Sequence, residues 1–105
     1  MGFFNLFRKA DMTEQLERFR SDPGAVLLDV RSPGEYAGGH IPGSVNLPLE
    51  QLNWGVQTYP LDTPVYLYCL SGARSSVAAE QLRRMGYETV IDLGGLNAYH
   101  GKVEQ

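Results

Sequence analysis

Cysteine is nearly absent from this sequence, since Cys69 stands alone among 105 residues. An internal disulfide is therefore excluded, and nothing in the cysteine usage indicates an oxidising compartment, so we expect a cytoplasmic protein. Histidine is scarce as well: only His40 and His100 occur, and they lie far apart in the sequence. With a single thiol they give no metal-ligand spacing, and we expect neither a metal nor a cofactor.

An excess of positive charge is also missing, because the formal net charge is −3. Binding to a phosphate backbone requires a basic face, so the charge argues against nucleic acid as a partner. No apolar run approaches the length of a transmembrane helix. The N-terminal stretch "MGFFNLFRKA" places its charges after the phenylalanines, whereas a secretory signal has them first.

What the chain does have is 43% hydrophobic residues, enough at this length for the core of one domain. We predict an aromatic N-terminal arm over residues 1–10, followed by a single domain over residues 11–105. We favour packing of the arm on that domain. Membrane contact or docking of a partner through the arm is the less favoured alternative.

Strands and helices alternate along the predicted domain. Short apolar runs bounded by glycine and proline predict strands over residues 25–30, 45–47, 63–69 and 87–93. Helical segments are predicted over residues 12–20, 33–37, 50–56 and 75–86 and close to the C-terminus. Thr13 and Ser32 are the expected N-caps, and Trp54 is expected in the core or in a pocket wall. This order predicts an α/β fold with a mostly parallel sheet covered on both faces.

The loop after Cys69 carries the strongest chemical signal. Cys69 ends a predicted strand, and in parallel sheets ligands bind beyond the carboxyl ends of strands. The next residues are small or flexible, so their backbone N–H groups can form an anion-binding nest in front of a helix N-terminus. Such a setting stabilises a thiolate. The alternatives are a cysteine that serves only as a small buried hydrophobe, and a solvated Arg74.

Three segments resemble the signatures of the rhodanese-like family. They are "LLDVRSPGEYAGGHIPGSVNLPL" (27–49), "YCLSGARSSVAAEQLRRMGY" (68–87) and "VIDLGGLNAY" (90–99), in the order the family has them. Many members carry Trp where this chain has Tyr99. The resemblance implies a single rhodanese-like domain with a mostly parallel central sheet of about five short strands and helices on both faces.

The resemblance also implies a sulfurtransferase mechanism. Cys69 would attack the sulfane sulfur of a small anionic donor such as thiosulfate, forming a persulfide. A thiophilic acceptor (cyanide in an assay, a thiol or a protein in the cell) would then take the sulfur. Arg74 would bind the donor's oxygens, while the loop would hold the donor or the persulfide. The expected donor-binding residues are Leu70, Ser71, Gly72, Ala73, Arg74 and Ser75.

Asp29 and Arg31 are expected to support the site. They flank Val30 at the end of the first strong strand, and we favour a structural ion pair that ties the strand end to the next segment, with Glu35 as a further partner. The alternative places them at the rim of the pocket. His40 is expected to hydrogen-bond the turn around it, outside the catalytic set.

Three functions remain open from the sequence. The first is a thiosulfate sulfurtransferase that uses Cys69. The second is a persulfide relay that takes sulfur from one protein and passes it to another, and the third is a non-enzymatic binding module. Retention of Cys69 and Arg74 argues against the third. The Cys69–Arg74 loop holds four residues, fewer than in related phosphatases, and therefore argues against phosphatase activity. Arsenate reduction is a further chemistry of relatives that stays open.

Overall fold

The structure is a computed structural model that describes residues 11–105. The predicted aromatic arm over residues 1–10 lies outside the described residues, so its packing and the boundary after it stay predictions. Within the described range, no helix has both the length and the apolar character needed to cross a bilayer.

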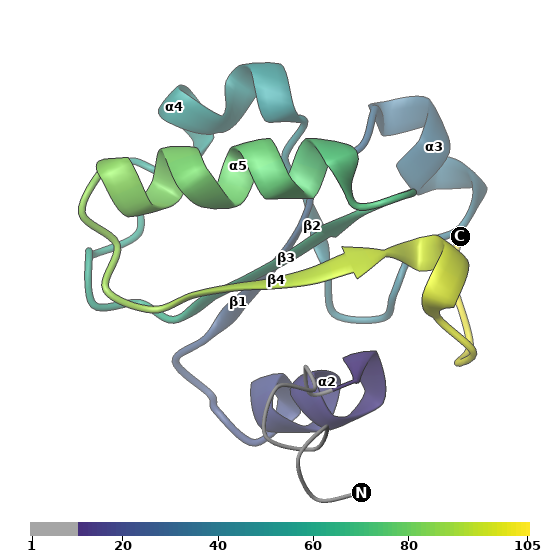
Figure 1. Cartoon of the computed structure of the whole chain (residues 1–105). Helices are drawn as coiled ribbons and strands as arrows, with labels where there is room; N and C mark the ends of the chain where they lie inside the picture. The colour runs from purple at the N-terminus through teal and green to yellow at the C-terminus, as the bar shows by residue number, and fades with distance from the viewer. Residues whose placement is uncertain (1–10) are drawn as a thin grey trace, which may run out of the picture.

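Four strands form one sheet in the order β2-β1-β3-β4, and each neighbouring pair runs parallel (Figure 1). The strands are β1 (Val26–Asp29), β2 (Val45–Asn46), β3 (Val65–Cys69) and β4 (Val90–Gly95). The α/β class and the parallel sheet are confirmed. The expected count of about five strands is too high for residues 11–105, because the C-terminal segment adds only an isolated antiparallel bridge between Glu104 and His40.

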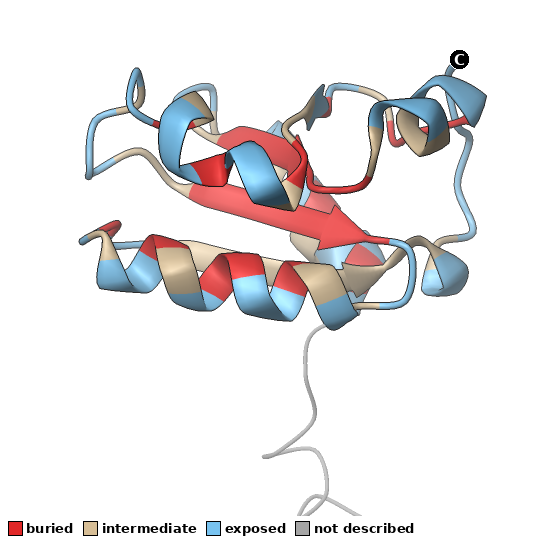
Figure 2. Ribbon diagram, turned by 90° about the horizontal axis from the view of Figure 1, so that it is seen from above, coloured by how far each residue is buried: buried red, intermediate tan, exposed pale blue. Residues whose placement is uncertain are grey.

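Helices cover both faces of this sheet. On one face lie α4 (Leu52–Gly55) and α5 (Ala73–Arg84), and on the other lies α2 (Met12–Arg20) (Figure 1). Side chains alternate along a strand, so Leu67 and Cys69 of β3 enter the core beneath α5, whereas Tyr66 and Tyr68 pack against α2. The central strands β1 and β3 are buried throughout (Figure 2), which explains why their sequences are continuous apolar runs.

The helix boundaries depend on capping. Asp11, not Thr13, is the N-cap of α2, since its side chain accepts a hydrogen bond from the N–H of Glu14. Ser32 caps α3 (Pro33–Gly38) as predicted, in a complete capping box with Glu35. Residues 11–105 also contain two 3₁₀ turns, η1 (Leu49–Gln51) and η2 (Leu96–Ala98).

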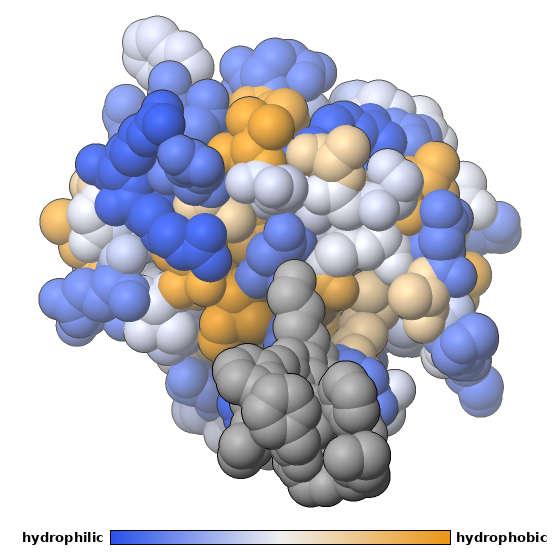
Figure 3. Space-filling view, viewed as in Figure 1, coloured by the Kyte–Doolittle hydropathy of each residue, from blue (hydrophilic) through white to orange (hydrophobic). Residues whose placement is uncertain are grey.

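Trp54 is exposed, contrary to the expectation that it lies in the core or a pocket wall. Its exposed fraction is 78%, because Leu52 and Val56, the first residue and the C-cap of α4, share the face that enters the core. α5 shows a similar division. Its inner face buries Ala78 and Leu82, while hydrophilic side chains gather over its C-terminal half (Figure 3).

A buried ion pair closes the end of β1. The Asp29 side chain is fully buried and accepts hydrogen bonds from the backbone N–H, Nε and Nη2 of Arg31, the last at 2.7 Å. Arg31 also donates to the carbonyl of Gly39 at 2.7 Å. The pair therefore ties the strand end to the segment after α3, through Gly39 and not through Glu35 as expected. This contact supports the structural role of the pair.

Replacing Arg31 by alanine should destabilise the fold strongly. The change leaves the Asp29 carboxylate buried without its counterion, a situation that costs about 3–5 kcal/mol. Arg84→Ala is the control, because its ion pair with Glu80 has a similar length of 2.8 Å but both side chains are largely exposed. The control should cost at most ~0.5 kcal/mol. Urea unfolding measures both, and equal losses would contradict the structural role of the buried pair.

Candidate active site

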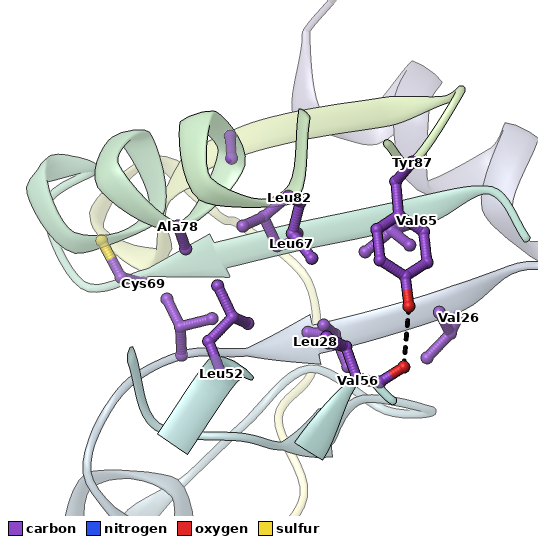
Figure 4. Close-up of a cluster of buried hydrophobic side chains, with 12 residues drawn as sticks. Val26, Leu28, Leu52, Val56, Val65, Leu67, Cys69, Ala78, Leu82 and Tyr87 are labelled. Atoms are coloured by element: carbon purple, nitrogen blue, oxygen red, sulfur yellow. Dashed lines mark hydrogen bonds between the residues drawn. The ribbon is translucent and has the colours of Figure 1, made fainter. Parts of the chain in front are cut away.

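The sulfur of Cys69 lies at the carboxyl end of β3, turned toward the first turn of α5 (Figure 4). The residue is fully buried. Its Sγ accepts hydrogen bonds from the backbone N–H of Gly72 at 3.0 Å and from that of Ser75 at 3.3 Å, and it lies 3.5 Å from the Ser75 hydroxyl. The predicted nest of N–H groups thus receives the cysteine sulfur itself.

The same sulfur serves as the cap of α5. The helix begins at Ala73, two residues before the predicted start. Its N-cap is Gly72, which has no side chain to accept a hydrogen bond from the helix. The first N–H groups of a helix need an acceptor, which a Ser or Asp side chain often supplies. Here Cys69 Sγ supplies it for Ser75. A thiolate in this position also interacts favourably with the helix dipole.

These hydrogen bonds change the acidity of the thiol. Burial alone would raise the pKa of Cys69, because the charged form is poorly solvated inside the protein. The hydrogen bonds from the Ser75 hydroxyl and from the N–H groups of Ser75, Gly72 and Arg74 outweigh burial, and the pKa lies below its usual value. The site therefore favours the nucleophilic thiolate.

The Ser75 hydroxyl can donate one proton, and more than one acceptor atom lies within hydrogen-bonding distance of it. Besides Cys69 Sγ, it lies 3.2 Å from the carbonyl of Gly72 and 3.3 Å from that of Gly94. A hydroxyl rotates to suit its surroundings, so its proton can turn toward the sulfur when the thiol ionises. Ser75 was predicted to bind the donor, and in the structure it contacts the Cys69 sulfur directly.

Two glycines at the end of β4, Gly94 and Gly95, let the loop after Cys69 pack closely against that strand. The N–H of Asn97 donates to the carbonyl of Leu70 at 3.1 Å. A side chain at Gly95 would overlap the carbonyl oxygen of Leu70 and come within 2.7 Å of the Ser71 carbonyl carbon. Gly94 has φ +94°, in the left-handed region. This role was not predicted from the sequence, although adjacent glycines directly after the predicted strand over residues 87–93 are a signal of close backbone approach.

Arg74 lies on the first turn of α5 and forms a two-pronged ion pair with Glu35 of α3. The distances are 2.6 Å from Nη1 to Oε1 and 2.9 Å from Nη2 to Oε2. The bond to Arg74 and those to Ser32 lower the pKa of Glu35 to about 2. Both side chains are partly exposed. This pair was not predicted from the sequence, where Glu35 was expected to be a partner of Arg31.

The other predicted residues divide into rim and scaffold. Leu70, Ser71 and Ala73 are exposed, and Leu70 presents 41% of its surface. His40 contacts the carbonyl of Tyr36 through Nδ1 at 2.8 Å, as expected for a residue that holds its turn. Among residues 11–105, no three His, Cys, Asp or Glu side chains gather in a way that would hold a metal ion.

A surface hollow of about 480 Å³ lies elsewhere. Residues of α2 and of the C-terminal segment line it, among them Leu16, Arg20 and Tyr99, and none of its lining residues belongs to the Cys69 loop. The hollow contains neither the Cys69 thiol nor the N–H groups that face it. The Cys69 sulfur lies under the loop after β3 and not in this hollow.

Gly95→Ala should disturb the loop and the thiol together. The added methyl group meets backbone atoms, which cannot rotate away, so we expect a loss of about 1–3 kcal/mol. The displaced loop should also withdraw N–H groups from Cys69 and raise the pKa of its thiol. Gly38→Ala is the matched control, because nothing lies within 4 Å of the added carbon. Urea unfolding measures the stability, and ultraviolet titration of the thiolate measures the pKa of Cys69. If Gly95→Ala changed neither the free energy of unfolding nor this pKa, the prediction would be wrong.

Comparison with known proteins places this geometry in a family. A model of the rhodanese-like domain matches residues 12–102. Among curated relatives, the uncharacterized protein YqhL of Bacillus subtilis is 44% identical over 81 residues, which are 76% of this chain and 64% of YqhL. A sulfurtransferase of Allochromatium vinosum is 34% identical over 91% of this chain and 92% of its own length. The putative sulfur carrier protein YrkF of B. subtilis is 35% identical over 85% of this chain but 51% of its own length.

Solved structures agree with the family match. The crystal structure of the Alr3790 protein from Anabaena sp. has a TM-score of 0.80 and 30% identity, covering 90% of this chain and 80% of that chain. A rhodanese with anions from E. coli has a TM-score of 0.72 and 31% identity, covering 77% of this chain and 98% of that chain. Both the sequence match and the fold extend over most of the described residues, and the chain belongs to the rhodanese-like domain family.

Proposed function

We propose that this protein is a sulfurtransferase that moves a sulfane sulfur from thiosulfate or a similar donor to a thiophilic acceptor through a Cys69 persulfide. The observation that carries the proposal is the contact of Cys69 Sγ with the N–H groups of Gly72 and Ser75 at the start of α5. Membership of the family and similarity to a sulfurtransferase support it. The nucleophile has to stay reduced, which fits a reducing compartment such as the cytoplasm.

The transfer takes place in two displacements at sulfur. The Cys69 thiolate attacks the outer sulfur of thiosulfate, a sulfur–sulfur bond forms, and sulfite leaves with the electron pair of the bond that breaks. The acceptor then attacks the outer sulfur of the persulfide, and Cys69 leaves as a thiolate. N–H groups that stabilise the thiolate assist the second step, because they stabilise the leaving group. No outside oxidant or reductant is consumed.

Arg74 is the proposed contact for the donor's oxygens. It lies on the first turn of α5, beside the loop, and offers N–H groups in addition to those on Glu35. The exposed loop residues Leu70, Ser71 and Ala73 form the proposed rim. Because Cys69 is covered, the loop has to shift before a donor sulfur can reach Sγ.

A persulfide relay between proteins is the second candidate. Two observations favour it: Leu70 presents an apolar surface at the rim, and one relative is named a putative sulfur carrier protein. The same persulfide would form, but its donor and acceptor would be proteins. Rapid turnover with cyanide and thiosulfate would favour the first candidate over this one.

Cys69→Ser should abolish the reaction. Thiosulfate treatment of the wild-type chain should add one sulfur in intact mass spectra, and thiocyanate should form from thiosulfate and cyanide. The added sulfur and the thiocyanate formation should both fall to background in the variant, because the serine hydroxyl does not form a persulfide. An added sulfur without turnover would favour the relay. If the reduced wild-type chain gains no sulfur from either thiosulfate or a protein persulfide, the proposal fails.

Ser75→Ala should raise the pKa of Cys69. The variant loses the hydroxyl that helps to lower this pKa but keeps the N–H of residue 75. The thiolate fraction rises with pH through the pKa, so the rate of persulfide formation should reach its plateau at a higher pH than in the wild type. Ultraviolet titration of the thiolate measures the pKa directly. Ser76→Ala, an exposed neighbour on α5, is the control, and equal titrations for the two variants would contradict the role of the Ser75 hydroxyl.

A further inference from the structure

The proposed anion contact of the site is already neutralised. Both terminal nitrogens of Arg74 bond the two carboxylate oxygens of Glu35, at 2.6 and 2.9 Å. Such a bidentate guanidinium–carboxylate pair is among the strongest hydrogen-bonded ion pairs in proteins. A donor that approaches Arg74 therefore meets a guanidinium whose positive charge is matched by a neighbouring negative one.

Glu35 is held where it is. Its Oε1 also accepts the backbone N–H and the hydroxyl of Ser32, each at 3.0 Å, in the capping box of α3. The pKa of Glu35 is lowered to about 2, first by Arg74 and then by Ser32, so the carboxylate stays ionised at any pH at which the enzyme would be assayed. It is a fixed counterion and not a mobile one.

A second arginine, just beyond the end of the neighbouring strand β1, is neutralised in the same way. Arg31 pairs with Asp29 at 2.7 Å, and both are buried. Asp29, Glu35 and Cys69 are also the negatively charged groups that act on Arg74. Two guanidinium charges are thus matched by two carboxylates, and the thiolate adds one negative charge. A free dianion such as thiosulfate receives little net attraction from these side chains and depends on the loop's N–H groups.

We propose that Glu35 is a specificity-determining residue that acts through Arg74: by neutralising the guanidinium it weakens the binding of free dianionic donors and favours sulfane donors of lower charge. Such donors include a persulfide carried on a thiol, or a thiosulfonate with a single negative charge. This assignment rests on the proposed function, since it concerns the donor of the same Cys69. As Glu35 acts through another side chain, it is a positioning residue.

Glu35→Gln tests the assignment, because glutamine retains the shape and the capping bonds to Ser32 but loses the charge. In the thiosulfate–cyanide assay, KM for thiosulfate should fall about tenfold, the effect of removing one unit charge a few ångströms from the donor. We expect kcat to change less than about twofold. With methanethiosulfonate, which carries one negative charge, KM should fall by about threefold, roughly half the free-energy change.

A purely structural role predicts the opposite result. If Glu35 only held Arg74 in place, its loss would raise KM for both donors. Glu80→Gln, which removes a carboxylate from the exposed Arg84 pair on α5, is the matched control and should leave both KM values unchanged. In an Arg74→Leu background, Glu35→Gln should lower KM for thiosulfate less than in the wild type, since the guanidinium that it uncovers is missing and only the direct repulsion between Glu35 and the donor is relieved.

The wild-type chain gives an independent test if a variant fails to fold. With Arg74 neutralised, KM for thiosulfate should vary little with ionic strength, and a steep rise of KM with salt would overturn the assignment. An unchanged or raised KM in folded Glu35→Gln, with sulfur transfer intact, would also overturn it while leaving the proposed function standing. If the wild-type Cys69 gains no sulfur from either small donor or from a protein persulfide, both proposals fail.

Discussion

The contact between the Cys69 sulfur and the N–H groups at the start of α5 constrains most of the site. A buried, ionisable sulfur is stable only where several donors face it, and Gly72 and Ser75 are two of them. To aim these donors at one point, the loop needs the left-handed backbone of Gly72, where φ is +102°. The loop must also lie close to β4, which Gly95 permits because it has no side chain.

Features with a local cause were predictable from the sequence. The segments that became β1 and β3 are buried on both faces, so their apolar runs indicate strands directly. Ser32 and Glu35 form a capping box, and Pro33 occupies the first helical position, so this short pattern fixes the start of α3. The placement of Cys69 at a strand end, before a small-residue loop and a helix, likewise needs only neighbouring residues.

Features that depend on distant segments were not predictable in the same way. Glu35 and Arg74 are 39 positions apart, and the sequence contains several oppositely charged residues with which each could form an ion pair. Trp54 is hydrophobic enough for a core, yet Leu52 of α4 and its C-cap Val56 enter the core in its place and leave it exposed. The start of α5 at Ala73 also depends on a tertiary contact, because Cys69 and not a neighbouring hydroxyl caps it.

The complete cover over Cys69 has a consequence for the lifetime of the protein. Peroxides and heavy metal ions attack thiolates, so a lowered pKa makes a cysteine vulnerable as well as reactive. With no surface exposed, the sulfur meets such agents only during brief openings of the loop. In the closed loop, Cys69 therefore combines a thiol of lowered pKa with protection from these agents. The rate of such damage then depends on how often the loop opens, in addition to the acidity of the thiol.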